Sequence, residues 1–300
     1  MDDDRGAAGR PQRLRDHAAL DAGRVRRADP QRGQHRALLP RRKTGVVVSG
    51  CDHRHLLVVG AQRCGTTFLS RSLGDHPDVA MASPSPPEPK VFCDDALTAR
   101  GSEWYHRTWF AHVRDEDLLG DKSTSYLEDP DAPERAARML GEVEVVALLR
   151  DPVRRAVSHW RFSTANGLET RDLEEALLAD LHDDQPWDPQ RSSVSPFAYV
   201  RRGRYAEQLA PWLSTFPTTT HVLFLEELLG DPGVLPALVD ALGLDPGRTP
   251  APPAAAVNAS PGDVPTLDRG VKEALEGYFQ DSNTRLAAQL GRPLPWQVET

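Results

Sequence analysis

The fold is decided by residues 55–74, which read HLLVVGAQRCGTTFLSRSLG. The apolar run at 56–59 is typical of a buried parallel strand, and the spacing of apolar residues after Gly65 predicts a helix that ends at Gly74. A short loop with glycine at both ends, residues 60–65, joins the strand to the helix. Because loop amides and the first turn of the helix point toward one spot, this arrangement predicts a site for an anion.

Two more apolar runs predict buried strands, at 143–149 and 221–225. The helices predicted from apolar spacing and from Pro152 lie at 104–110, 173–181, 205–216, 235–242 and 271–290, with one more that starts at 152. Strands that alternate with helices indicate an α/β fold, a P-loop-like parallel sheet flanked by helices on both faces, in a single domain. Ligands of such folds bind beyond the carboxyl ends of the strands.

Composition divides the chain into two parts. Residues 1–50 lack any apolar period and are expected to form a disordered basic tail, while residues 51–300 form the folded domain. The chain has 44 Asp and Glu against 36 Lys and Arg, and this net charge of −8 at pH 7 argues against a nucleic-acid partner. The Pro- and Ala-rich stretch 245–265 is expected to be a surface loop.

The cysteine count and the hydropathy pattern predict a cytoplasmic protein. Three cysteines do not make a disulfide framework, which favours a reducing compartment. No run of about 18 apolar residues predicts a membrane span, and the N-terminus has no apolar secretory segment. No pattern in the sequence indicates the oligomeric state.

The loop between strand and helix differs from that of a nucleotide triphosphatase in one residue. Its two glycines have P-loop spacing, but Thr66 stands where such an enzyme carries lysine, and the cation inside the loop is Arg63. A plain turn would explain the glycines but not the grouping of arginine and threonines at a strand end. Cys64 is expected to pack rather than to react. The predicted anion contacts are Gln62, Arg63, Cys64, Gly65, Thr66 and Thr67.

A second anion site is predicted where the strand at 143–149 ends. Arg150 follows that strand, and Ser158 lies about two turns along the helix that starts at Pro152. A guanidinium binds phosphate through two hydrogen bonds, and a serine hydroxyl adds another. The alternative is a surface ion pair between Arg150 and Asp151 or another acid. Two anion sites on neighbouring strand ends suit a nucleotide that carries phosphate at both its 3′ and 5′ positions.

Together these motifs resemble sulfotransferases that use 3′-phosphoadenosine 5′-phosphosulfate (PAPS), most closely bacterial members related to the heparan-sulfate type. The resemblance extends over residues 55–297 and implies PAPS as co-substrate, with no metal. The further matching segments are His76-Pro77, Glu88-Pro89-Lys90-Val91-Phe92, Gly120-Asp121-Lys122-Ser123, Gly203-Arg204-Tyr205, and Leu290-Gly291-Arg292 before Trp296.

By this resemblance, the loop at 60–67 holds the 5′-phosphosulfate, while Arg150 and Ser158 hold the 3′-phosphate. In-line sulfuryl transfer builds negative charge on the bridging oxygen as its bond to sulfur breaks, and Arg63 is placed to stabilise the leaving phosphate. The neighbouring Arg154, Arg155 and Arg161 are expected to be mostly solvated helix charges.

The resemblance also assigns the acid–base residues. Glu88, in a Glu-Pro-x-x-Phe pattern, occupies the position of the catalytic base, and Lys122 that of a residue near the transferring group. The alternatives are an ordinary exposed loop acid and a solvated lysine. Asp121 and Ser123 are expected to orient the acceptor. Pro87 departs from the family, since relatives often carry lysine immediately before this glutamate.

The acceptor is expected to be a hydroxyl, less readily an amine, of a carbohydrate or small molecule. Its pocket is expected to be shaped by 93–118 and 162–200. Asn258 resembles a late family block, but the basic cluster that relatives place near it is absent, and Arg269-Gly270 is a poor substitute. Two other functions stay open: a non-catalytic nucleotide-binding protein, and a P-loop kinase or nucleotide triphosphatase.

Overall fold

The computed structural model describes residues 53–188, 194–249 and 265–297. The predicted tail at 1–50, most of the predicted loop at 245–265, and Asn258 within it lie outside the described residues. No helix among the described residues is long and apolar enough to cross a membrane.

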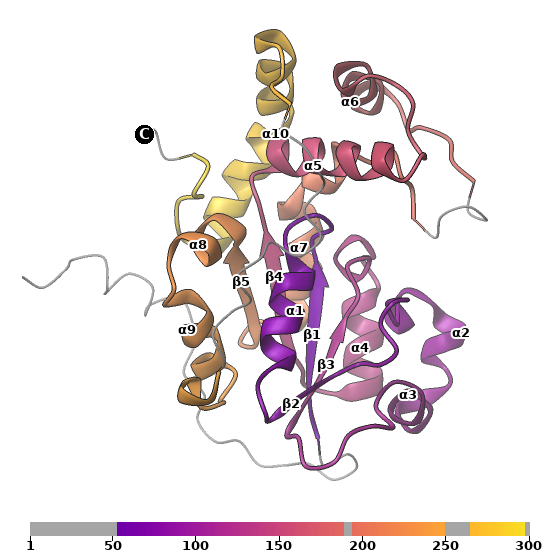
Figure 1. Ribbon diagram of the computed structural model, residues 1–300, viewed down its shortest axis with the longest axis vertical. Helices are drawn as coiled ribbons and strands as arrows, with labels where there is room; N and C mark the ends of the chain where they lie inside the picture. Colours follow the sequence, from indigo (N-terminus) through magenta and orange to yellow (C-terminus); the bar gives the residue numbers. More distant parts are fainter. Residues whose placement is uncertain (1–52, 189–193, 250–264, 298–300) are drawn as a thin grey trace, which may run out of the picture.

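Five parallel strands form one sheet in the order β2-β3-β1-β4-β5 (Figure 1). The strands are β1 Arg54–Gly60, β2 Val79–Met81, β3 Leu118–Lys122, β4 Glu144–Leu149 and β5 Thr220–Phe224. β1 lies at the centre, and its residues 56–59 are fully buried. The predicted α/β class with a parallel sheet is confirmed. Because the strands run in one direction, their carboxyl ends meet at one edge of the sheet.

Helices cover both faces of the sheet, as predicted. In Figure 1, α1 lies on one face and α7 on the other, where α7 packs against α4 and α10. The helices are α1 Thr66–Gly74, α2 Asp95–Thr98, α3 Gly101–Trp109, α4 Ala132–Leu140, α5 Pro152–Ala165, α6 Leu173–His182, α7 Tyr205–Thr215, α8 Leu225–Gly230, α9 Val234–Ala241 and α10 Arg269–Leu290. Short 3₁₀ turns are η2 Val91–Cys93, η3 Tyr126–Glu128, η4 Arg201–Gly203 and η5 Pro246–Arg248.

The strands β2 and β3 were not predicted from the sequence. β2 has only three residues, and β3 reads LLGDK, in which glycine, aspartate and lysine are poor strand formers. β3 forms because it pairs with β1 on one side and β2 on the other, so tertiary pairing overrides local preference. As a result, Lys122 ends a strand beside Val58 of β1 instead of lying in a loop.

Helices α5, α6 and the upper part of α10 lie beyond the carboxyl edge of the sheet (Figure 1). They enclose a second apolar cluster, whose fully buried members include Leu177, Leu275 and Phe279. The start of α5 is fixed locally, because the Asp151 carboxylate accepts from two backbone N–H groups and Pro152 occupies the first helical position. α5 therefore begins directly where β4 ends, above the edge at which ligands are expected.

Candidate active site

The loop after β1 is closed by a backbone contact and by a glycine in a left-handed conformation. The N–H of Ala61 donates to the carbonyl of Leu148 at 2.7 Å. Gly65 has a φ of 87°, and a Cβ there would lie 2.7 Å from a methyl group of Leu225. Gly65 provides no capping side chain for α1. The first-turn N–H groups of α1 therefore remain donors directed beyond the end of β1.

Arg63 turns from this loop toward α5. Its Nε donates to Ser158 Oγ at 3.4 Å, and its guanidinium carbon lies 4.7 Å from the centroid of the Phe162 ring. Burial, followed by the positive charges of Arg150 and Arg155, lowers the pKa of Arg63. The backbone contact between Ala61 and Leu148 places the loop cation beside the cation at the end of β4, and the contribution of the Arg150 charge to the lowered pKa agrees with this.

Arg150 directly follows β4 and is half-buried. Its guanidinium forms no hydrogen bond or ion pair with any residue that the structure describes. Pairing with Asp151 is not observed, because that carboxylate accepts from the N–H groups of Val153 at 2.8 Å and Arg154 at 3.0 Å. The loop and the strand end, predicted as two anion sites, are thus brought side by side, with Arg63 in contact with Ser158.

Arg155 lies beneath this region and is not the solvated helix charge expected from the sequence. It is fully buried, and its guanidinium donates to the carbonyls of Tyr199 and, at 3.5 Å, Ala198. Its Nε and Nη1 have no hydrogen-bond partner among the described residues. Burial lowers the pKa of Arg155, and it also lowers that of His159, which faces Arg202 as well as Arg155. A buried guanidinium without a carboxylate partner adds positive potential under the loop.

Arg202, in η4, is a second basic residue that the sequence did not single out. It is buried, its Nε donates to Glu128 at 2.8 Å, and its Nη1 donates to the side-chain oxygen of Gln62. Gln62 is therefore oriented by Arg202 within the loop. The only sequence signal was its place directly before Gly203 in a family-like segment.

The remaining predicted loop residues differ in how deeply their side chains are buried. Cys64 is fully buried 3.6 Å from the hydroxyl of Tyr205, and burial raises the pKa of its thiol to about 11. The expectation that it packs is confirmed. Thr66 is buried at the start of α1, while Thr67 is half-buried.

Glu88 and Lys122 form an ion pair at the same edge of the sheet. Lys122 Nζ lies 2.7 Å from Glu88 Oε1, and the two side chains are only 14% and 20% exposed. The other carboxylate oxygen accepts from the backbone N–H of Thr124 at 2.9 Å and from its hydroxyl at 3.0 Å. Neither alternative, a plain exposed acid or a solvated lysine, describes this pair. Thr124, which the sequence missed, follows Lys122 in the polar run at 123–125.

The ion pair of Glu88 and Lys122 lies next to the loop at 60–65. The N–H of Ser123 donates to the carbonyl of Val58 at 3.2 Å, and a Cβ on Gly60 would lie 3.3 Å from the carbonyl oxygen of Thr124. Glu88 therefore lies near the start of the loop that carries Arg63. Asp121 and Ser123 are fully buried, so the expectation that they orient an acceptor is wrong.

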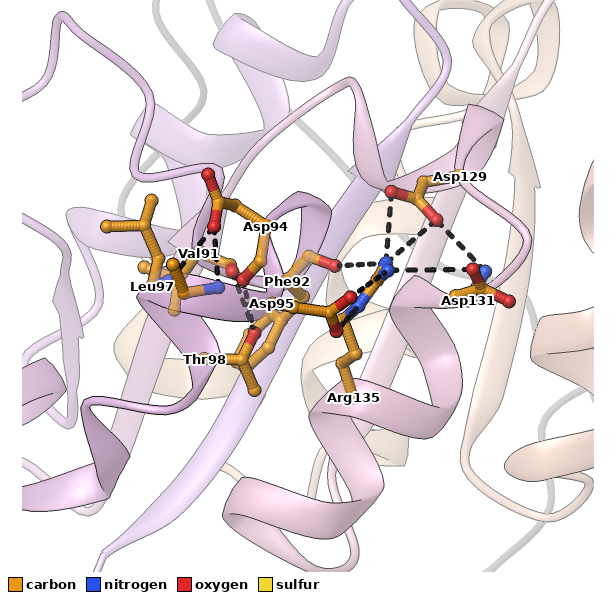
Figure 2. A network of polar contacts seen from close by, with 10 residues as sticks. Val91, Phe92, Asp94, Asp95, Leu97, Thr98, Asp129, Asp131 and Arg135 are labelled. Atoms are coloured by element: carbon orange, nitrogen blue, oxygen red, sulfur yellow. Dashed lines mark hydrogen bonds and ion pairs between the residues drawn. The ribbon is translucent and has the colours of Figure 1, made fainter.

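A polar cluster around Arg135 of α4 anchors the segments that follow Glu88 and Lys122 (Figure 2). Arg135 donates to Asp95 at 2.7 Å, to Asp129 at 3.1 and 3.2 Å, and to the carbonyl of Phe92 at 3.3 Å. Asp94 accepts from two N–H groups at the start of α2. These contacts join η2, α2 and the end of η3 to one helix, which limits movement of the Glu88 loop relative to β3.

The described residues contain no group of three or more His, Cys, Asp or Glu side chains that could hold a metal ion. The expectation of a metal-free reaction stays a prediction.

The parallel sheet, the arginine-bearing loop and the second cationic strand end define a P-loop-like α/β protein. Residues 53–234 match the family described as "Sulfotransferase domain", and the chain therefore belongs to the sulfotransferase family. The predicted family membership is confirmed. The structure brings all ten residues predicted to bind and react into one region. Nine lie at the carboxyl ends of β1, β3 and β4, and Ser158 lies above them on α5; the nine are Gln62, Arg63, Cys64, Gly65, Thr66, Thr67, Glu88, Lys122 and Arg150.

The match between this chain and its curated relatives covers only part of each relative's length. The human "Heparan sulfate glucosamine 3-O-sulfotransferase 6" is 34% identical over 194 residues, 63% of this chain and 52% of that protein. The mouse "Bifunctional heparan sulfate N-deacetylase/N-sulfotransferase 4" is 27% identical over 300 residues, 87% of this chain and 32% of that protein. The chain thus spans about a third to two thirds of the length of the curated relatives it matches.

A solved structure agrees with the fold. The sulfotransferase from Alicyclobacillus acidocaldarius is 25% identical, with a TM-score of 0.64 over 82% of this chain and 98% of that one.

Proposed function

We propose that this chain transfers a sulfuryl group from PAPS to a hydroxyl of a carbohydrate or small-molecule acceptor. The observation that carries the proposal is geometric: the loop that bears Arg63 is hydrogen-bonded to the end of β4, which Arg150 follows, and Arg63 contacts Ser158, beside the ion pair of Glu88 and Lys122. A nucleotide with phosphate at both its 3′ and 5′ positions needs two adjacent cationic sites, whereas a nucleoside triphosphate needs only one.

The described residues fit such a nucleotide. The uncapped first turn of α1 and the Arg63 guanidinium would hold the 5′-phosphosulfate, while Arg150 and Ser158 would hold the 3′-phosphate. The unpartnered Nε and Nη1 of buried Arg155 leave positive charge that an anion above it would compensate. PAPS, when bound, supplies a sulfuryl group activated by attachment to a phosphate oxygen.

Glu88 would accept the proton of the acceptor hydroxyl. Lys122 and Thr124 fix its carboxylate: Oε2 accepts from the N–H and the hydroxyl of Thr124, while Oε1 accepts from Lys122 and keeps a lone pair for the acceptor hydroxyl. Lys122 lies within 2.7 Å of that carboxylate and can therefore also approach the transferring group. Arg63 stays protonated and would stabilise the negative charge that develops on the leaving phosphate. Positioning and fixed charge would supply most of the catalysis.

The acceptor class rests on similarity. Curated relatives are named for sulfotransfer to heparan sulfate, which favours a carbohydrate hydroxyl. We also propose a reducing, cytoplasmic location, which is supported by the free thiols of Cys64 and Cys93.

A transfer assay tests the proposal. Radiolabelled PAPS is incubated with a panel of hydroxylated carbohydrates and phenols, and mass spectrometry records the gain of one sulfuryl group. We expect Glu88→Gln to lower the rate at least about 100-fold, because general-base catalysis contributes on this scale. Its affinity for adenosine 3′,5′-bisphosphate should stay within about twofold, since Glu88 is assigned to the acceptor and not the nucleotide. Glu276→Gln, an acid on α10 paired with Lys272, is the matched control.

The two alternative functions give different results. A wild-type protein that binds the bisphosphate but labels no acceptor would favour non-catalytic nucleotide binding. Tighter binding of ATP with Mg²⁺ than of the bisphosphate would favour a kinase or nucleotide triphosphatase.

A further inference from the structure

Asp121 is a carboxylate in the core of the protein, one residue before Lys122. It is fully buried, and its hydrogen-bond partners among the described residues are three hydroxyl groups. Burial of a carboxylate is costly unless its oxygens are satisfied. The three hydroxyl groups satisfy both carboxylate oxygens of Asp121, and the direction of each hydroxyl is therefore set by this acid.

Each hydroxyl around Asp121 has a defined direction. Ser123 Oγ donates to one carboxylate oxygen at 2.9 Å, while the hydroxyls of Tyr126 and Tyr105 donate to the other at 2.7 and 3.1 Å. A hydroxyl has one hydrogen and two lone pairs. Because the carboxylate takes the hydrogen, the lone pairs of each hydroxyl must face elsewhere.

Two of the three hydroxyls use those lone pairs to hold the Glu88 loop. Ser123 Oγ accepts the backbone N–H of Lys90 at 2.9 Å, and the Tyr126 hydroxyl accepts that of Val91 at 2.9 Å. These residues follow Glu88 after a single proline. Among the described residues, the Tyr105 hydroxyl accepts no N–H of this loop, although it donates to the same carboxylate oxygen as Tyr126.

The segment from Asp121 to Tyr126 therefore binds the Glu88 loop through two sets of polar contacts. In one, Lys122 and Thr124 hold the carboxylate of Glu88. In the other, the hydroxyls oriented by Asp121 hold the backbone immediately after it. A base that must meet an acceptor hydroxyl within hydrogen-bond distance depends on both, since misplacement of about 1 Å can cost about 100-fold in rate.

We propose that Asp121 is a positioning residue for the reaction: through Ser123 and Tyr126 it orients the Lys90–Val91 backbone and thereby places Glu88 against Lys122. This inference rests on the proposed function for its catalytic consequence. It assigns Asp121 and Ser123 to the enzyme framework and not to the acceptor.

The two buried tyrosines provide a matched test. Tyr126→Phe and Tyr105→Phe each remove one hydroxyl that donates to Asp121, but only the first removes an acceptor of a loop N–H. We expect Tyr126→Phe to lower kcat at least about tenfold, with Tyr105→Phe within about twofold of wild type. Affinity for adenosine 3′,5′-bisphosphate should be unchanged in both. Asp121→Asn, which no longer accepts all three hydroxyls, should lower kcat further.

Amide hydrogen exchange reads the same contacts without catalysis. We expect faster exchange at Val91 in Tyr126→Phe and at Lys90 in Ser123→Ala, with no change at either in Tyr105→Phe. Ser123→Ala also replaces Tyr126→Phe in the kinetic comparison if the latter does not fold.

The outcomes separate the two proposals. Equal kcat values for the tyrosine variants, or equal exchange at Val91, would overturn the role of Asp121. A wild-type protein that labels no acceptor would overturn the proposed function, and the exchange measurement would then decide alone whether the Asp121 network holds the loop.

Discussion

Arg154 and Arg155 are neighbours on α5 with opposite surroundings. The side chain of Arg154 is 69% exposed, whereas Arg155 is fully buried and lacks a carboxylate partner among the described residues. A charge in the interior acts over several ångströms because the effective dielectric constant there is far below that of water. We therefore expect Arg155 to contribute to anion binding without touching the anion.

We predict that Arg155→Met weakens binding of adenosine 3′,5′-bisphosphate by about tenfold, which corresponds to about 1.4 kcal/mol. Isothermal titration measures the affinity, and circular dichroism checks that the variant is folded. Arg154→Met is the control, and its affinity should change by less than about twofold, since water screens an exposed charge. Equal losses in both variants would contradict the role of the buried charge.

At the same scale, motifs predicted which residues gather at the carboxyl edge of the sheet, but not which charged residues are buried beneath it. Glu88 and Lys122 were predicted from patterns of neighbouring residues, although their direct contact was not. Arg155 and Asp121 were misassigned, because a sequence written in one dimension does not show which charged side chains turn inward. That distinction depends on how α5 and β3 pack against other elements.

Among the elements, the junction of β1, loop and α1 is sterically constrained. Gly65 combines a φ of 87° with a missing Cβ that would lie 2.7 Å from Leu225. We predict that Gly65→Ala lowers the free energy of unfolding by about 1–2 kcal/mol, because the left-handed conformation disfavours a side chain. It should also weaken bisphosphate binding, since the first turn of α1 must shift. Urea unfolding and isothermal titration measure these two effects.

Gly277 in α10 supplies the contrasting glycine. A Cβ there meets no atom within 4 Å, so Gly277→Ala should raise the free energy of unfolding by about 0.5–1 kcal/mol. Destabilisation by this variant, or none by Gly65→Ala, would contradict the account of the loop.

An element could be predicted when the residues that stabilise it are contiguous in the sequence, and not when pairing with distant segments stabilises it. β1, β4 and β5 were predicted because their apolar residues are contiguous in the sequence. β2 and β3 were missed because their pairing with β1 stabilises segments that have little strand preference of their own. Their absence from the prediction also hid the position of Lys122 beside the loop.

For the whole molecule, buried titratable groups link folding to pH. Burial and the adjacent His106 lower the pKa of His55 to about 3, while an unfolded histidine titrates near 6.5. As pH falls below about 6.5, the unfolded chain takes up a proton that folded His55 refuses, so folding is destabilised. Burial raises the pKa of Asp121 to about 6, and this group has the opposite sign, because the folded state binds its proton first.

We predict that wild type loses stability between pH 7 and pH 5, and that His55→Gln loses about 2 kcal/mol less over the same interval. The comparison cancels the contributions of Asp121 and His159, which both proteins share. Urea unfolding at the two pH values provides the free energies. His112→Gln, at an exposed position, should retain the wild-type pH dependence. Identical slopes for His55→Gln and wild type would contradict this prediction.

The central claim is that Arg63 and Arg150 bind opposite ends of one doubly phosphorylated nucleotide. Its most direct test is isothermal titration of adenosine 3′,5′-bisphosphate into wild type, Arg63→Ala and Arg150→Ala. We expect one site in wild type and affinities at least about tenfold weaker in each variant, because each loses a charge-assisted contact with phosphate. Unchanged affinity in both variants would contradict the claim.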